Sequence, residues 1–225
     1  MAPSILSDIT SRYSPFMAFG YDWFVAPAVS TLRAPLEERV VSALPEGGRL
    51  LDVGCGGGQA AMAFAQRRPD LDVVGVDLSP EQVRRARRRA AGMSSTVHFV
   101  EGSALDLPFD EGSFDGVLSV ASIKHWPDRR RGIAECARVL RKGARLAIVE
   151  ADRGCRLDDA RAFVDLWRIP EVARPVMLAV FRTWVAGQAL DLEDLREAVY
   201  GLPLVDVSIE RMQGIPAMML SARKA

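Results

Sequence analysis

The chain has 225 residues, with 29 basic and 29 acidic side chains, and 49% of its residues are apolar. This length predicts one main domain, and the balanced charge gives no field that favours nucleic acid or an acidic membrane surface. No stretch reaches 18 uncharged apolar residues, so no membrane span is predicted. The first residues lack the pattern of a signal peptide, and the cysteines form no CxxC pair, which favours a reduced, cytoplasmic setting.

Residues 1–48 are predicted to form helices and loops, because Pro15, Pro27 and Pro35 limit the length of any helix there. We expect this stretch to be an N-terminal lid region whose aromatic side chains exclude water from a site. The aromatic residues that carry this expectation are Tyr13, Tyr21 and Trp23.

From residue 49 the pattern alternates between short runs rich in Val, Ile and Leu and longer helical stretches. The predicted strands are residues 49–53, 71–77, 95–102, 113–120 and 144–150. The predicted helices are residues 59–70, 79–91 and 128–143. Ser79 is expected to cap the second of these helices, and Gly143 is expected to end the third. This alternation predicts a parallel sheet that is covered by helices on both faces.

After Glu150 the rhythm changes. Residues 157–199 are predicted to be helical, with breaks at Pro170, Pro175 and Gly187. Two further strands are predicted at residues 203–212 and 216–225, close enough in the chain to pair antiparallel.

The stretch "LLDVGCGGGQ" places four glycines in five positions directly after the first predicted strand. Glycines at the carboxyl end of a parallel strand let backbone N–H groups approach a ligand closely. The dinucleotide pattern G-x-G-x-x-G/A is satisfied by Gly56, Gly58 and Ala61. An alternative pattern, acid-x-Gly-x-Gly-x-Gly, begins at Asp52 and Gly54.

Several segments occur in a recognisable order: "LLDVGCGGGQAA", "VVGVDLSPEQVRRAR", "FVEGSALDLPFDEGSFDGVLSV", "HWPD" and "ECARVLRKGARLAIVE". Over residues 47–152 the chain resembles the class I S-adenosylmethionine-dependent methyltransferases, within the small-molecule branch that contains quinone- and sterol-type enzymes. The resemblance implies an α/β, Rossmann-like, seven-stranded and mostly parallel sheet with an antiparallel last strand. It implies a methyltransferase domain at 49–225 with a helical cap inserted at about 157–200.

The resemblance also assigns residues to the cofactor, S-adenosylmethionine. The loop residues that would line its methionine and ribose parts are Gly54, Cys55, Gly56 and Gly58. Asp52 would help to bind the methionine amino group through water. Ser119 and Val120, at the end of the fourth strand, would flank the methionine.

At the end of the second strand, Asp77 would accept hydrogen bonds from both ribose hydroxyls, and Leu78 would pack on the adenine. Ser103 and Ala104 would meet the edge of the adenine. The family usually has an acid at position 103, and a serine hydroxyl lacks the charge assistance of a carboxylate. Glu101 and Asp106, two acids beside the turn, are the alternatives for binding the adenine amino group.

Three residues near the carboxyl ends of strands are candidates for a catalytic base. His125 follows the fourth strand, and Glu150 and Asp152 follow the fifth. Histidine has an ordinary pKa near 6.5, which suits proton transfer at neutral pH, although a histidine here can also be a structural loop residue. No Asn-Pro-Pro-aromatic motif follows the fourth strand, which disfavours methylation of adenine or glutamine amino groups.

The expected cap carries aromatic residues beside arginines, a combination that suits a flat or polyhydroxylated ligand such as a sugar. These residues are Phe163, Trp167, Phe181 and Trp184, with Arg161, Arg168, Arg174 and Arg182. The alternative is that the aromatic rings only pack the cap onto the sheet.

The predicted function is O-methylation of a small-molecule hydroxyl, on a sugar or another metabolite. The alternatives are C-methylation of a quinone- or sterol-type substrate, an NAD-dependent oxidoreductase, and a non-catalytic regulator that binds the cofactor. The run "RRARRRA" is expected to form a solvated helix face and not a nucleic-acid site. The oligomeric state and any metal requirement stay open.

Overall fold

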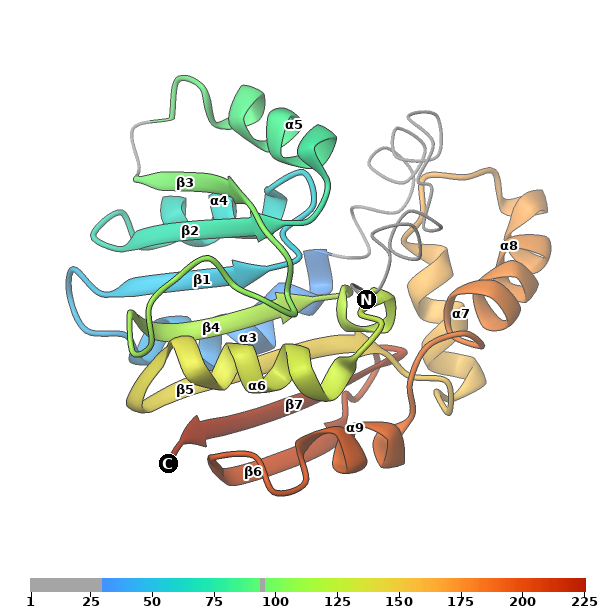
Figure 1. The fold of residues 1–225 in the computed structure, drawn as a ribbon. Coiled ribbons are helices and arrows are strands. Elements are labelled where there is room, and N and C mark those ends of the chain that lie inside the picture. The colour runs from blue at the N-terminus through green and yellow to red at the C-terminus, as the bar shows by residue number, and fades with distance from the viewer. Residues whose placement is uncertain (1–29, 94–95) are drawn as a thin grey trace, which may run out of the picture.

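The computed structural model describes residues 30–93 and 96–225, so Tyr13, Tyr21 and Trp23 lie outside the described residues. A seven-stranded sheet has the order β3-β2-β1-β4-β5-β7-β6 (Figure 1). Its strands are β1 (Arg49–Val53), β2 (Asp72–Asp77), β3 (Val97–Glu101), β4 (Phe114–Val120), β5 (Leu140–Ala151), β6 (Leu204–Arg211) and β7 (Ala217–Lys224). The first five strands pair in parallel, and β7 runs antiparallel to both β5 and β6. The predicted sheet is confirmed.

Helices cover both faces of the sheet. The helices of one face are α3 (Arg33–Arg39), α4 (Gln59–Arg67) and α5 (Pro80–Ala90), and those of the other are α6 (Arg129–Val139) and α9 (Leu192–Val199). Side chains alternate along a strand, so neighbouring residues enter different cores. Leu50 packs in the cluster that contains Phe64 of α4, whereas Leu51 packs in the cluster that contains Ile133 of α6.

Two predicted helix ends can be compared with the structure, the start of α5 and the end of α6. The Ser79 side chain accepts a hydrogen bond from the Gln82 N–H at 3.4 Å, as predicted for an N-cap. The prediction that Gly143 ends the third helix is wrong. That helix, α6, ends at Val139, because Leu140 already pairs with Phe114 of β4 and so draws the following residues into β5.

The helical segment expected at 157–200 divides into two parts. The first part comprises α7 (Leu157–Asp165), the short turn η6 (Glu171–Ala173), α8 (Arg174–Val180) and a π-helical turn η7 (Phe181–Val185). It stands beyond the carboxyl ends of the parallel strands and has its own apolar cluster (Figure 1). The second part, α9, contacts α6 and β6, and its Leu195 belongs to the same apolar cluster as Ile133 of α6. We use "cap" below for residues 157–186 alone.

Candidate active site

The glycine loop after β1 is shaped by three residues with positive φ: Gly54 at +73°, Gly56 at +52° and Gly58 at +80°. A Cβ at Gly54 would lie 1.8 Å from the Ser122 Oγ, and a Cβ at Gly58 would lie 2.6 Å from the Phe99 ring. A Cβ at Gly56 would have no described heavy atom within 4 Å. Gly54 and Gly58 are therefore required by close packing, whereas Gly56 borders open space that a ligand can fill.

Asp77, the last residue of β2, fixes this loop. Its Oδ2 accepts a hydrogen bond from the Gly56 N–H at 2.8 Å, and its Oδ1 accepts one from the Ser79 N–H at 2.9 Å. Burial raises the pKa of Asp77, and the two hydrogen bonds oppose that change. Leu78 is 48% exposed beside it, so an apolar surface lies open next to the carboxylate.

Asp52 lies beneath the loop as a buried carboxylate. Its Oδ2 is buried and has no hydrogen-bond partner among the described residues. Burial, and then the nearby Asp77 charge, raise the pKa of Asp52 to about 7. A buried carboxylate in this state is stabilised by a cation, which makes Asp52 suited to an ammonium group.

Cys55 is a packing residue of the same loop. Its backbone N–H donates to the Val76 carbonyl at 3.0 Å, and its side chain belongs to the core beside Gly75. Burial, followed by the charge of Asp52, raises the pKa of the Cys55 thiol well above its ordinary value. The thiol is therefore a poor nucleophile.

The turn after β3 contains Ser103 and Ala104. The Ser103 Oγ accepts a hydrogen bond from the Leu105 N–H at 3.1 Å, which uses part of its acceptor capacity inside the turn. Glu101 and Asp106, the alternative acids, are both exposed. Gly102 donates its N–H to the Asp77 carbonyl, so this turn lies next to the end of β2.

The end of β4 holds Ser119 and Val120. Ser119 is fully buried, and its hydroxyl donates to the Val53 carbonyl of β1 at 2.8 Å. This side chain therefore links β4 to β1. Val120 is partly buried against the core.

His125 lies in the loop that follows β4, at the end of a short turn η5 (Ile123–His125). In this loop the Trp126 Nε1 donates to the Ser122 Oγ at 3.1 Å, and Ser122 in turn lies against Gly54. His125 is exposed, yet local desolvation and then the Lys124 charge lower its pKa below 6.5. The imidazole is therefore neutral near pH 7, and its pKa of about 4 makes it a weaker base than a free imidazole. A hollow of about 670 Å³ borders His125 and Trp126.

The two other candidates for a base are engaged in buried contacts. Glu150 is fully buried and accepts hydrogen bonds from the N–H groups of Ala151 and Lys124. Asp152 pairs with the Arg211 Nε at 2.6 Å and accepts a hydrogen bond from the backbone N–H of a nearby glycine. These contacts leave neither carboxylate directed at a substrate, so they favour His125.

In the cap, three of the four aromatic residues pack on one another. The ring centroids of Phe163 and Phe181 are 5.3 Å apart, and Trp167 lies 6.3 Å from the first and 6.2 Å from the second. Trp184 instead is 70% exposed. Of the two alternatives, packing therefore accounts for Phe163, Trp167 and Phe181, which form the cap's own core.

Four arginines of α5 are exposed, as expected for a solvated face, but two of them also bind backbone carbonyls. Arg89 Nη1 donates to the Gly57 carbonyl at 3.1 Å, and Arg87 donates to the Phe99 carbonyl. Arg84 does lie outside, paired with Glu81. Arg89 thus supports the glycine loop through a contact between residues 32 positions apart, which the helical pattern does not reveal.

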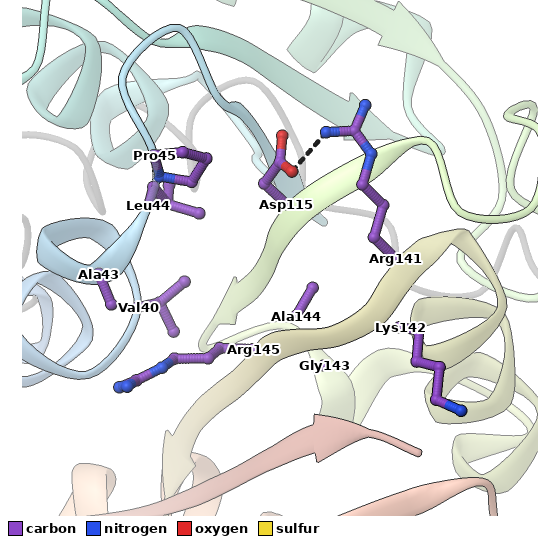
Figure 2. A pocket seen from close by; sticks show the side chains of 10 residues that line it. All are labelled: Val40, Ala43, Leu44, Pro45, Asp115, Arg141, Lys142, Gly143, Ala144 and Arg145. Carbon is purple, nitrogen blue, oxygen red and sulfur yellow. Dashed lines mark hydrogen bonds and ion pairs between the residues drawn. The ribbon is translucent and has the colours of Figure 1, made fainter.

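A second hollow, of about 260 Å³, lies at the opposite edge of the sheet, near the start of β4 and β5 (Figure 2). Asp115 and Arg141 point toward each other there and form an ion pair, while the side chains of Lys142 and Arg145 extend in different directions. Because these cations do not converge, this hollow offers no focused charge to a ligand.

The described residues offer neither a metal-binding cluster nor a membrane-spanning helix. Within 30–93 and 96–225, no three His, Cys, Asp or Glu side chains come together as possible metal ligands. In the same part of the chain, no helix has the length and apolar character needed to cross a membrane.

The family described as "Methyltransferase domain" matches residues 51–148. O-methyltransferase rstn1 from Aspergillus nomiae is 33% identical to this chain over 206 residues, which cover 86% of this chain and 88% of the relative. The chain belongs to the class I S-adenosylmethionine-dependent methyltransferases. This membership decides against the NAD-dependent oxidoreductase.

Other relatives agree with this family. The 27-O-demethylrifamycin SV methyltransferase of Amycolatopsis mediterranei is 34% identical over 189 residues, covering 80% of this methyltransferase and 68% of the relative. The fold is that of Haemonchus contortus phosphoethanolamine N-methyltransferase 2, solved in complex with S-adenosyl-L-methionine. The TM-score is 0.72 at 18% identity, and the match covers 99% of this chain and 60% of that one.

The loop residues of this methyltransferase fit the family's cofactor, S-adenosylmethionine. The Oδ2 of Asp52, which has no hydrogen-bond partner among the described residues, would suit the methionine ammonium, and the open space beside Gly56 would let the cofactor approach the backbone. Asp77 offers carboxylate oxygens for ribose hydroxyls, and exposed Leu78 offers an apolar face for the adenine.

Proposed function

We propose that this chain methylates a hydroxyl oxygen of a small molecule, with His125 as the general base. The observation that carries the proposal is the position of His125. It is exposed in the loop after β4, and that loop contacts the glycine loop through Ser122 and Gly54. A base at the cofactor's edge of the sheet suits an acceptor that must lose a proton.

The relatives support oxygen as the acceptor atom. Those that cover most of this chain include the O-methyltransferase of Aspergillus nomiae and the rifamycin-type O-methyltransferase of Amycolatopsis mediterranei. The demethylmenaquinone methyltransferase of Deinococcus radiodurans is 37% identical, but over 102 residues, 45% of this chain. Carbon methylation of a quinone-type acceptor is therefore the second candidate. Sugars remain within the proposed class of hydroxylated acceptors, although the buried cap aromatics no longer favour them over other hydroxyl compounds.

When bound, S-adenosylmethionine supplies an electrophilic methyl group. The chain's own contribution begins with alignment, because holding the hydroxyl in line with that methyl can contribute several kcal/mol to lowering the barrier. The imidazole of His125 accepts the hydroxyl proton as the oxygen becomes nucleophilic, a step that contributes about 10²–10⁴-fold in rate. Since His125 is exposed and its pKa is lowered, the imidazolium then passes the proton readily to solvent.

The test is a methyl-transfer assay with methyl-¹³C S-adenosylmethionine and a panel of sugars, phenols, other alcohols and a demethylquinone. Mass spectrometry detects transfer, and the ¹³C chemical shift distinguishes methyl on oxygen from methyl on carbon. We expect label on oxygen, lost in His125→Asn and retained in His98→Asn. His98 is the chain's other histidine and lies exposed in β3, so it is a matched control. Label found on carbon alone would overturn the proposal.

A further inference from the structure

A buried carboxylate, Glu150, contacts the loop that carries His125. Glu150, at the carboxyl end of β5, is fully buried. Its Oε2 accepts a hydrogen bond from the backbone N–H of Lys124 at 3.2 Å, and its Oε1 lies 3.8 Å from the Lys124 Nζ. Oε1 also accepts a hydrogen bond from the Ala151 N–H at 2.8 Å. Lys124 is the residue directly before His125, so these contacts act next to the imidazole.

The same loop is constrained at its start. Ala121 has a φ of +51°, a left-handed conformation that non-glycine residues rarely adopt, and its N–H donates to the Val149 carbonyl at 2.8 Å. Strain of this kind persists only where surrounding contacts hold it. Beyond His125, the Trp126 ring packs on Gly132 of α6 so closely that a Cβ there would lie 2.4 Å from it. Contacts with β5 and α6 thus fix the loop on both sides of His125.

We infer that Glu150 and Lys124 are a positioning pair, which fixes the position and orientation of the His125 loop for proton transfer. The inference rests on the proposed function for its consequence in catalysis, but its structural content concerns only the loop. A pair of apolar residues of similar volume is commonly as stabilising as a buried ion pair, so stability alone does not require these charges. A carboxylate that binds both the backbone and the side chain of one residue, however, fixes that residue's orientation.

The variants that test the pair are Glu150→Gln, Lys124→Met and the double variant, all in the full chain. Removing one charge leaves the other buried and unpaired, whereas the double variant has a neutral pair of similar size. The matched control is Asp115→Asn. Asp115 is 12% exposed, pairs with Arg141 and accepts a hydrogen bond from the Arg49 N–H, but it lies at the opposite edge of the sheet (Figure 2).

The first readout is the ring NMR signal of His125, which is easily assigned because the chain has two histidines. We expect Glu150→Gln to shift or broaden the His125 signal while the His98 signal stays unchanged. We expect Asp115→Asn to move neither signal. Unchanged His125 signals in folded Glu150→Gln and Lys124→Met would overturn the inference, whichever residue is the base.

The second readout is steady-state kinetics at temperatures where each variant is folded. We expect Glu150→Gln to lower kcat at least tenfold, with cofactor Kd and acceptor KM within about twofold of wild type. The double variant should recover thermal stability but not kcat, because a neutral pair relieves the buried unpaired charge without restoring the carboxylate that orients residue 124. If thermal stability falls but kcat of the folded protein does not, Glu150 is structural only and the inference fails. If His125→Asn keeps full activity while the His125 signal moves in Glu150→Gln, the proposed base fails and the positioning pair stands.

Discussion

The Asp77 Oδ2 accepts a hydrogen bond from the Gly56 N–H at 2.8 Å, which joins the end of β2 to the glycine loop after β1. The carboxylate therefore holds the loop in shape while it faces the region where the ribose hydroxyls are expected. If Asp77 also binds the ribose, as proposed, loss of its side chain removes both the loop contact and the ligand contact.

Asp77→Ala should weaken binding of S-adenosylmethionine at least tenfold. Each hydrogen bond to a charged group contributes about 1.5–3 kcal/mol, and the variant loses the acceptor for the Gly56 N–H and for the ligand. Isothermal titration calorimetry measures this, with exposed Asp110→Ala as the control. An Asp77→Ala protein with wild-type affinity would contradict the assignment of the ribose site.

Gly56→Ala and Gly58→Ala should have different effects, because Gly56 borders open space and Gly58 packs against Phe99. Both residues have positive φ, which costs about 1–2 kcal/mol for an alanine. At Gly58 the new Cβ also meets the Phe99 ring, so Gly58→Ala should lose clearly more stability in urea unfolding. At Gly56 the Cβ enters open space, so the main effect should be weaker cofactor binding. Equal losses of stability in the two variants, with Gly56→Ala binding normally, would show that the space is not used.

Cofactor binding should release a proton through Asp52. Its pKa of about 7 without ligand is raised by burial and by Asp77, and a bound ammonium lowers it. Below pH 7 the carboxyl is largely protonated, so affinity should increase as pH rises toward 7. Calorimetry at pH 6 in two buffers of different ionisation enthalpy measures the proton released. Asp52→Asn should abolish that release; if the release is the same in both proteins, another group titrates.

The same group affects stability. Because its pKa is 3.8 in the unfolded chain and about 7 in the folded one, the folded state binds more protons between these values. The contribution of Asp52 to the free energy of unfolding therefore falls as pH rises through this window. Urea unfolding at pH 5 and pH 8 should show a steeper fall for wild type than for Asp52→Asn.

The cap tryptophans should behave differently from each other. Trp167 is 6% exposed and packs against both Phe163 and Phe181, so Trp167→Ala should destabilise the protein by about 3–5 kcal/mol. Trp184 is 70% exposed, and Trp184→Ala should change stability by about 0.5 kcal/mol or less. Chemical unfolding decides between them. A stability loss in Trp184→Ala that matches Trp167→Ala would place both rings in one core.

Much of this architecture could be predicted from the sequence, because its signals are local. The run of Val and Leu before the glycines predicts β1, and Ser79 and Pro80 predict the start of α5. The apolar run that ends at Asp77 predicts that this acid is at the end of β2. These features depend on residues within a few positions of one another. Their physical basis is strand periodicity, helix capping and glycine conformation.

The contacts that could not be predicted join residues far apart in the chain. Glu150 and Asp152 look alike in sequence, but one binds Lys124 and the other Arg211 of β6. Gly143 has the usual signal for a helix end, and strand pairing of Leu140 overrides it. Trp167 and Trp184 both lie in predicted helices of the cap, and the sequence does not show which of them is buried. The structure shows that Trp167 is buried and Trp184 exposed.

The rate of methyl transfer to a hydroxyl acceptor in His125→Asn tests the central claim most directly. Asparagine keeps approximate size and hydrogen bonding but cannot take the proton, so kcat should fall about 10²-fold or more, with cofactor Kd unchanged. His98→Asn should keep wild-type kcat, and wild-type kcat should be constant from about pH 7 to 8 because the pKa of His125 is lowered below 6.5. A fall of less than about threefold in His125→Asn, below the range that a general base contributes, would contradict its role as the base.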